Sequence, residues 1–517
     1  MVVDPGRLPR PPDERDDRER AVGLDVQGVA PVAVGIAEPL LGREDVRAWE
    51  VTAQRRGDEL RGGLPVGLDA DRAAHGGDQV GDLAGVGADG GGGGHRDGSL
   101  SRVYRSGRPD VPICSSQRAG LATAPGKMVR MQSEGALAGL KVLELTQIMA
   151  GPFCGQVLAD LGADVVKIEP PEGGDQARRS LGFPLREGGD TAAFLAVNRN
   201  KRSAALDLKD PGQREQFYGL VRGADVLIEN FRPGVAARLG VDYETLEPIN
   251  PRLIYASISG FGQTGPYAQR PGFDLIAQGL AGVMSVTGEP GGEPVKCGVP
   301  IGDLSAGLFC AVAILAARIA RERTGRGQHI DTSLFEGALA LSIWESAELW
   351  ATGRTPQPLG SAHRLTAPYQ ALRTGDGHIT VGANSERFWR RLCAAVGREE
   401  LAEDPRFATN AARMEHRPEL VAELESALAV RGTGEWVEIL LEAGVPAGAI
   451  HDYREVFDDP HTLAREMVVE VDHPVEGRVK ALGIPVKLSA TPGSVRRAAP
   501  LLGEHTGEVL REAGSAR

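Results

Sequence analysis

Residues Lys141 to Glu169 have the sequence KVLELTQIMAGPFCGQVLADLGADVVKIE, and this stretch decides the fold. Its two ends, Lys141–Thr146 and Ala163–Glu169, are short and rich in Val, Leu and Ile, which predicts two buried strands. Gly151–Gly162 between them has the apolar spacing of a helix. A strand, a helix and a second strand in this order form a right-handed crossover in which the strands are parallel. We therefore predict a parallel sheet covered by helices.

The same alternation continues along the chain. Ser203–Leu208, Asp225–Glu229 and Leu253–Ile258 are further predicted strands, with a helix near Gln213–Val221. Strands that alternate with helices indicate the α/β class, here a Rossmann-like large domain with its sheet between two helical layers. Ligands of such sheets bind beyond the carboxyl ends of the strands. The loops expected to bind ligand are Thr146–Pro152, Glu169–Asp175, Asn230–Gly234 and Ser259–Gly265.

Composition divides the chain into five segments. Residues 1–133 hold no Phe and a single Lys among many Gly, Pro, Asp and Arg residues, which predicts a disordered low-complexity extension. The alternative is a start site assigned too far upstream, and we favour a true start at Met128 or Met131. Residues 134–350 are expected to form the N-terminal part of the large domain, followed by a polar linker at 351–359. Residues 360–455 are predicted to be a smaller α+β domain, and 456–517 are expected to return to the large domain.

Charge and cysteine content exclude several classes of function. The formal net charge of −12 argues against a general nucleic-acid or membrane-surface role. Five scattered cysteines without a CxxC pair predict reduced thiols in a cytoplasmic protein, not disulfides or a zinc site. The longest apolar run, Leu304–Ile319, contains Ser305 and Gly307 and predicts a core helix, not a membrane span.

Asp303 is the candidate catalytic residue. It stands in GVPIGDLSAG (298–307), at a glycine-flanked break just before that apolar run. A carboxylate at such a place is poorly solvated and accessible to a ligand, which suits a nucleophile. The alternative is a helix N-cap that accepts a backbone N–H near Ser305, and the local pattern alone favours this cap.

Two further loops carry groups that could bind a nucleotide. Asn198–Ser203 holds three cations in four residues and is either a solvated loop or a phosphate-binding patch that includes Arg202. Glu229–Gly234, together with Arg238, combines an aromatic ring, an amide and guanidinium groups, although Phe231 could equally be a core residue. The dinucleotide and Walker fingerprints are missing, as are Ser-His-Asp, Cys-His and HExxH arrangements, so NAD, ATP, hydrolase and metal chemistry lack support.

Taken in order, these segments resemble the class III CoA-transferases, the group of the formyl-CoA and carnitine CoA-transferases, to which the α-methylacyl-CoA racemases are related. Each matching segment is weak alone, but the ordered set from about residue 135 to the C-terminus is very specific. The matching segments are LAGLKVLEL (137–145), AGP (150–152), LGADVVKIE (161–169), GD (174–175), NKRS (200–203), ENFRPG (229–234), NPR (250–252), GD (302–303), TGRGQ (324–328), GVP (444–446) and LLGEHT (501–506).

The resemblance implies that CoA is moved from an acyl-CoA donor to a carboxylic acid acceptor. The family's nucleophile falls on Asp303, which would form an aspartyl mixed anhydride and then an aspartyl-CoA thioester. Coenzyme A and acyl-CoA are then substrates, and no metal or tightly bound cofactor is expected. The family's CoA contacts fall on Leu206, Lys209, Asn230, Phe231 and Arg238.

The resemblance also implies an interlocked homodimer, with the active site between the large domain of one subunit and the small domain of its partner. His363 and Arg364 are then candidates to meet the acceptor carboxylate, and Gln147 in the first loop is a further substrate candidate. Neither nucleic acid nor membrane is an expected partner.

Departures from the family pattern bear on specificity. Pro170, Met149 and Ser259 stand where the formyl-CoA enzymes have Arg, Gln and Lys, and their tetraglycine lid has no counterpart near 360–368. These differences favour an acceptor larger than formate or oxalate. Phe273 replaces the racemases' catalytic His, so transfer is preferred over racemisation, which needs two bases. A non-catalytic CoA-binding protein is the third hypothesis.

Overall fold

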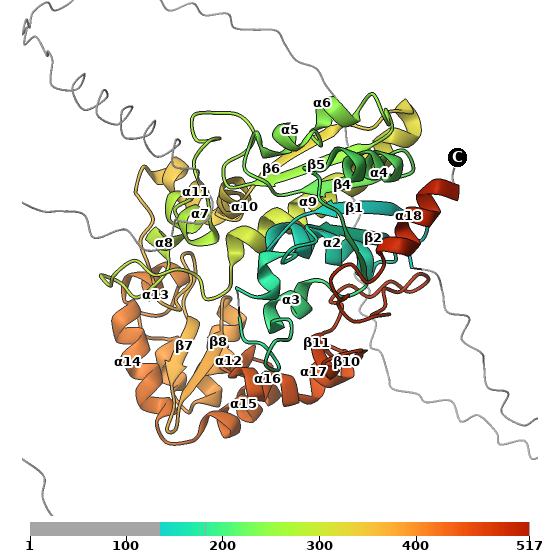
Figure 1. Cartoon of the computed structure of the whole chain (residues 1–517). Coiled ribbons are helices and arrows are strands. Elements are labelled where there is room, and N and C mark those ends of the chain that lie inside the picture. The colour runs from blue at the N-terminus through green and yellow to red at the C-terminus, as the bar shows by residue number, and fades with distance from the viewer. Residues whose placement is uncertain (1–134, 181, 516–517) are drawn as a thin grey trace, which may run out of the picture. The chain divides into compact units, whose positions relative to one another are not determined.

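The computed structural model describes residues 135–180 and 182–515 (Figure 1). The predictions for residues 1–133 lie outside the described residues. Six parallel strands form the main sheet in the order β3-β2-β1-β4-β5-β6. The strands are β1 (Lys141–Leu145), β2 (Asp164–Glu169), β3 (Lys201–Ala205), β4 (Val226–Glu229), β5 (Ile254–Ser259) and β6 (His329–Ser333). This is the Rossmann order, and the direction of winding reverses between β1 and β4, where ligands bind in such sheets.

Alternate side chains of the inner strands enter two different hydrophobic cores. On β4, Val226 and Ile228 face one core while Leu227 faces the other, and β1 and β5 alternate in the same way. Helices α2 (Ala150–Asp160) and α9 (Ile301–Thr324) cover the first face. Helices α4 (Pro211–Val221) and α18 (Thr506–Ser515) cover the second. Both faces of the sheet's centre are therefore buried, and its inner strands β1, β4 and β5 are mostly apolar, whereas the edge strands β3 (KRSAA) and β6 (HIDTS) are mostly polar.

Shorter helices connect these layers. They are α3 (Ala192–Val197), α5 (Val235–Leu239), α6 (Tyr243–Leu246), α7 (Asp274–Leu280), α8 (Val283–Val286), α10 (Leu334–Ala340) and α11 (Ile343–Thr352), with a 3₁₀ turn η1 at Gln176–Arg178.

Helix α9 is less buried than predicted. Ala306, Cys310 and Ile314 pack into the first core, whereas Leu308 and Val312 on the other side are exposed. By length and composition alone, α9 could also cross a membrane, and 39% of its most apolar window is buried.

A second α+β unit with its own core follows the linker. Trp389, Phe407 and Trp436 fill this core, and the guanidinium of the fully buried Arg413 is bound by Glu386 and the carbonyl of Phe407. Its elements, mostly orange in Figure 1, are β7 (Tyr369–Arg373), β8 (His378–Gly382), β9 (Ala447–Ala449), α12 (Glu386–Ala395), η2 (Glu399–Ala402), α13 (Asn410–Glu415), α14 (Arg417–Leu428) and α15 (Thr433–Glu442).

The C-terminal segment lies against the free edge of the main sheet. It contains α16 (Tyr453–Asp458), α17 (Pro460–Ala464) and the hairpin β10 (Val468–His473) to β11 (Gly477–Leu482) before α18. His505 donates its N–H to the carbonyl of Ser203 at 2.9 Å, and Thr506 Oγ1 accepts the N–H of Ala205 at 2.9 Å. These bonds give partners to backbone groups of β3, which would otherwise be an open edge strand.

The predicted third sheet strand was misplaced. We expected Ser203–Leu208, but β3 begins two residues earlier, at Lys201, and ends at Ala205. Lys201 and Arg202 therefore belong to the strand, not to the loop before it. The buried carboxylate of Glu144 compensates the charge of Lys201, and Arg202 pairs with carboxylates that are partly exposed.

Candidate active site

Asp303 lies in the first turn of α9, directly after the break at Pro300. The N-cap residue is Pro300, so the predicted capping role of Asp303 is wrong. Within residues 135–180 and 182–515, the carboxylate of Asp303 has no hydrogen-bond or ion-pair partner. A partly buried carboxylate without such a partner is unusual and points to function, because polar groups taken out of water normally find a bond.

The cap of α9 comes from Asp274, a residue that sequence reasoning missed. Asp274 Oδ1 accepts the N–H of Gly302 at 2.8 Å and of Asp303 at 3.4 Å, and its Oδ2 accepts Gln278 Nε2 at 2.7 Å. A Cβ at Gly302 would lie 3.0 Å from Asp274 Oδ1, so glycine permits this close approach. The one local signal was the segment PGFD (271–274), and nothing in it indicates that its aspartate caps α9.

Burial and the neighbouring Asp274 set the charge state of Asp303. Burial first, and the nearby Asp274 second, raise the pKa of Asp303 to about 7. Its carboxylate is therefore weakly stabilised as an anion, which is a property expected of a catalytic carboxyl group.

Two predicted site residues meet at the reversal point of the sheet. The side-chain oxygen of Asn230, after β4, accepts the N–H of Gln147 at 2.9 Å, and its amide nitrogen donates to the carbonyl of Gln147 at 2.8 Å. The loops after β1 and β4 are thus tied together where a ligand is expected.

The other predicted CoA contacts divide into apolar and cationic groups. Leu206 is buried in the second core, and Phe231 packs partly buried against that same core. Lys209 and Arg238 are exposed, and their cationic groups have no partner in the described chain. Two unpaired cations on an acidic protein are suited to phosphate groups.

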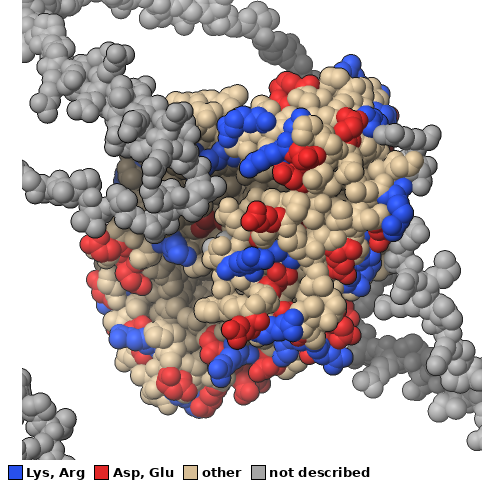
Figure 2. Space-filling view, viewed as in Figure 1, with Lys and Arg blue, Asp and Glu red and all other residues tan. Residues whose placement is uncertain are grey.

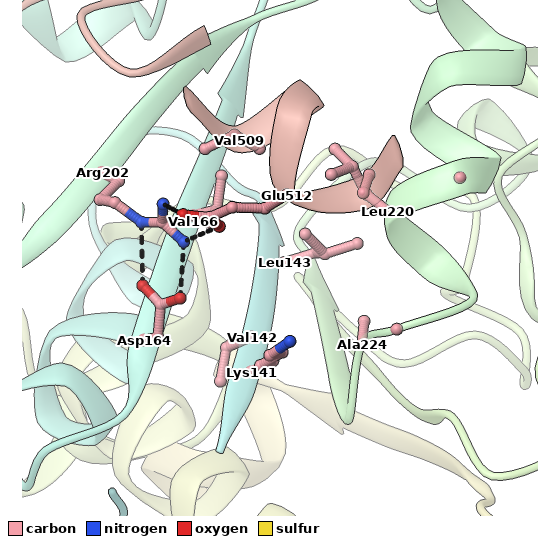
Figure 3. Close-up of a pocket in the computed structure, with 13 residues that line it drawn as sticks. Lys141, Val142, Leu143, Asp164, Val166, Arg202, Leu220, Ala224, Val509 and Glu512 are labelled. Carbon is pink, nitrogen blue, oxygen red and sulfur yellow. Dashed lines mark hydrogen bonds and ion pairs between the residues drawn. The ribbon is translucent and has the colours of Figure 1, made fainter. Parts of the chain in front are cut away.

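Arg202 is placed differently from our prediction. Its guanidinium is bound by Asp164 at 2.6 and 3.0 Å, by Glu508 at 2.8 Å and by Glu512 at 2.9 and 3.0 Å. Figure 3 shows Arg202 between Asp164 and Glu512, beneath the C-terminal helix. These contacts fix α18 to the sheet, so we leave Arg202 out of the candidate CoA site.

Both interpretations of Asn198–Ser203 are therefore wrong, since the segment is buried, and its cations are neutralised. Arg199 pairs with Asp160 at 2.7 Å and Lys201 with Glu144 at 2.8 Å. On the face shown in Figure 2, positive and negative side chains are interspersed.

His363 and Arg364 contact residues of the same chain. Arg364 pairs with Glu345 and Glu348 of α11, both at 3.0 Å, and the ring of His363 packs against Trp344 and Tyr369. Their role toward an acceptor stays a prediction.

A cavity of about 730 Å³ extends from the start of α9 to the C-terminal hairpin. Its lining is mainly apolar and includes Leu304, next to Asp303, with Phe153 of α2 and Val471 of β10. In the described ranges, 135–180 and 182–515, no three His, Cys, Asp or Glu residues are grouped to hold a metal ion.

Comparison with known proteins matches this architecture. Residues 137–506 match the model of the CoA-transferase family III. The chain is 41% identical over 381 residues to a succinate–glutarate CoA-transferase of Agrobacterium fabrum, covering 73% of this chain and 95% of that protein. It is 43% identical over 382 residues to an acetyl-CoA:oxalate CoA-transferase of Acetobacter aceti, covering 73% and 96%. The crystal structure of a CAIB/BAIF family protein from Brucella suis superposes with a TM-score of 0.67 at 41% identity, covering 74% of this chain and all of that one.

Proposed function

Since this chain belongs to the CoA-transferase family III, we propose that it moves coenzyme A from an acyl-CoA donor to a carboxylic acid through covalent intermediates on Asp303. The observation that carries this proposal is the partly buried carboxylate of Asp303, which has no partner in the described chain and a pKa raised to about 7 by burial and by Asp274. A nucleophile of this kind needs to be exposed to substrate and shielded from water, because water would hydrolyse the intermediates.

The proposed reaction conserves the activated acyl bond. The Asp303 carboxylate attacks the donor thioester carbonyl, which forms a mixed anhydride and expels CoA as a thiolate. The thiolate attacks the aspartyl carbonyl, releases the donor acid and leaves an aspartyl-CoA thioester. The acceptor carboxylate attacks this thioester, and the expelled thiolate then attacks the acceptor carbonyl of the new anhydride. This last step gives the new acyl-CoA and restores Asp303.

Several observations support the placing of the substrates. Lys209 and Arg238 are available for the CoA phosphates, and Leu206 and Phe231 provide apolar surface for the adenine. The names of the two relatives above indicate short carboxylic acids as acceptors. The cavity that reaches Leu304 is large enough for a longer acyl group, in line with the acceptor size that the sequence favours. The four cysteines in the described residues are free thiols, which supports a cytoplasmic location.

Incubation with succinyl-CoA and a panel of mono- and dicarboxylic acids tests the reaction. We expect new acyl-CoA thioesters by mass spectrometry, without ATP or added metal, and hydroxylamine should trap a modified peptide that contains Asp303. Labelling confined to another residue would contradict the mechanism.

Isomerisation is not favoured by the site. Phe273, at the position of the racemase base, is 63% exposed and precedes Asp274 at the start of α7. A phenyl ring exchanges no proton. In the same assay, deuterium uptake at the α-carbon of a 2-methylacyl-CoA without acyl exchange would instead support a racemase.

We also propose that two chains interlock as a homodimer, with the partner's small domain completing the site near its His363 and Arg364. Support comes from large exposed apolar side chains on α9 and α11, among them Leu308, Phe309 and Trp350. Patches of this kind mark interaction surfaces.

Light scattering is expected to give twice the chain mass. Interlocked chains cannot separate without unfolding, so two differently tagged dimers should form no mixed dimer until they are denatured and refolded together. A monomer, or rapid exchange of subunits under native conditions, would refute the interlocked arrangement.

A further inference from the structure

The loop that joins β1 to α2 is held in an unfavourable backbone conformation. Of the non-glycine residues in the described chain, three have a positive φ, and Ile148, with φ of 72°, is the β-branched one. Left-handed backbone crowds a β-branched side chain and persists only where its surroundings enforce it. The loop lies at the reversal point between β1 and β4, and the side chains of Gln147, Ile148 and Met149 are half-buried there.

Three successive residues of this loop are fixed by side chains from other elements. Lys167 Nζ, on β2, donates to the carbonyl of Thr146 at 2.7 Å. Asn230 binds the N–H and the carbonyl of Gln147. Asp175 Oδ1, from the loop after β2, accepts the N–H of Ile148 at 3.1 Å. We name Lys167, Asp175 and Asn230 the loop clamp.

Two members of the loop clamp are fully buried and paired. Lys167 Nζ lies 2.9 Å from Asp175 Oδ2 and 3.0 Å from Glu144 Oε1, and none of the three side chains is exposed. Burial alone would lower the pKa of Lys167, but Glu144 and Asp175 outweigh it and hold the pKa above its usual value. Buried ion pairs add little stability compared with apolar residues of the same size, so net stability alone does not explain their use here.

We propose that Lys167 and Asp175 are positioning residues that hold Thr146–Met149 in one conformation, so that the side chains of Gln147 and Met149 present a preformed surface to the acyl-CoA. This inference rests on the proposed function, from which it takes acyl-CoA as the ligand. It assigns a role to Asp175 at the end of Glu169–Asp175, one of the loops that the sequence predicts to bind ligand. A preformed loop improves binding because no ordering cost remains when the substrate arrives.

The test is a pair of substitutions whose effects depend on each other. Asp175→Ala removes the acceptor of the Ile148 N–H, and we expect it to raise KM for acyl-CoA about tenfold or more. Ile148→Gly makes the positive φ free of strain, so Asp175→Ala in that background should raise KM less than threefold. Equal fold-changes in both backgrounds would overturn the proposal, because Asp175 would then not act through Ile148.

A matched control separates positioning from loss of stability. Arg321→Met breaks a different ion pair, between the buried Arg321 and the partly buried Asp225 at 2.7 Å, at the opposite end of the sheet. It should lower the unfolding temperature and leave KM unchanged. If KM rises in Arg321→Met as it does in Asp175→Ala, the effect is general destabilisation, and the proposal fails.

Hydrogen–deuterium exchange gives a readout that does not need activity. Asp175→Ala should speed exchange at the amides of Gln147 and Ile148 more than tenfold, with no change in α14 of the small domain. If the unmodified protein neither binds CoA nor transfers it, the proposed function fails, while the exchange rates still decide whether Asp175 holds the loop. Unchanged exchange in Asp175→Ala would overturn the positioning role.

Discussion

Asp303→Asn is expected to lower kcat/KM for CoA transfer by about a thousandfold or more, because an amide cannot form the anhydride. The substitution keeps the size of the side chain, and Asp274 still caps α9, so the fold should persist. Appearance of the new acyl-CoA, followed by mass spectrometry with succinyl-CoA as donor, measures the loss. Turnover near the original rate would refute the nucleophile.

The same variant is expected to be more stable than the original protein at pH 8. The folded pKa of Asp303 is about 7, whereas an unfolded Asp has a value near 3.8. A carboxyl group whose pKa is raised on folding contributes stability that is fully present below the unfolded pKa and is lost as the pH rises from there through the folded pKa of about 7. Removing the charge should therefore add about 1 to 2 kcal/mol at pH 8, allowing for solvent screening. The difference in stability between the two proteins should disappear below about pH 4, where Asp303 is neutral in both the folded and the unfolded state.

Asp376→Asn is the matched control with the opposite sign. Hydrogen bonds from the backbone and side chain of Thr433 lower the pKa of Asp376, so its charged form stabilises the fold at neutral pH. This variant should lose stability at pH 8 and keep its transfer activity. If both variants change stability in the same direction, the raised pKa of Asp303 is not the cause.

Local patterns were sufficient for the strands and for the class of fold. Runs of Val, Leu and Ile predicted β1, β2, β4 and β5 to within a residue or two, because strands buried on both faces are apolar at most positions. The turn between β7 and β8 also has a local signal, because TGDG (374–377) is typical of a tight turn between antiparallel strands.

Local sequence patterns could not predict the ion pairs between residues far apart in the chain. A run of cations is solvated in most proteins, but Arg199, Lys201 and Arg202 each meet a carboxylate from a distant segment. The partners of Arg202 include Glu508, some 300 residues later. The cap of Asp303's helix has the same character, because Asp274 belongs to another helix. In both cases the decisive contact is set by the tertiary fold.

Among the buried charged residues, Glu144 has the largest expected effect on the free energy of unfolding. Its carboxylate lies 3.0 Å from Lys167 Nζ and 2.8 Å from Lys201 Nζ, and all three side chains have no exposed surface. With Asp175, the group holds two positive and two negative charges and is neutral. A Cβ on Gly155 of α2 would clash with this carboxylate, which explains a glycine inside a helix.

Glu144→Gln should destabilise the fold by about 3 to 5 kcal/mol, because it leaves one uncompensated buried ammonium group. Burial already lowers the pKa of Lys201 to about 8, and without Glu144 it should fall further, so Lys201 sheds its proton on folding. The free-energy cost of deprotonating Lys201 falls as the pH approaches the pKa of a lysine in the unfolded chain. The destabilisation by Glu144→Gln should therefore become smaller between pH 7 and 9.5. Chemical denaturation at several pH values measures this pH dependence.

The double variant Glu144→Gln with Lys201→Met restores neutrality around Lys167 and Asp175 and should recover at least half of the lost stability. Strictly additive losses would show that charge compensation is not what holds Glu144 in place.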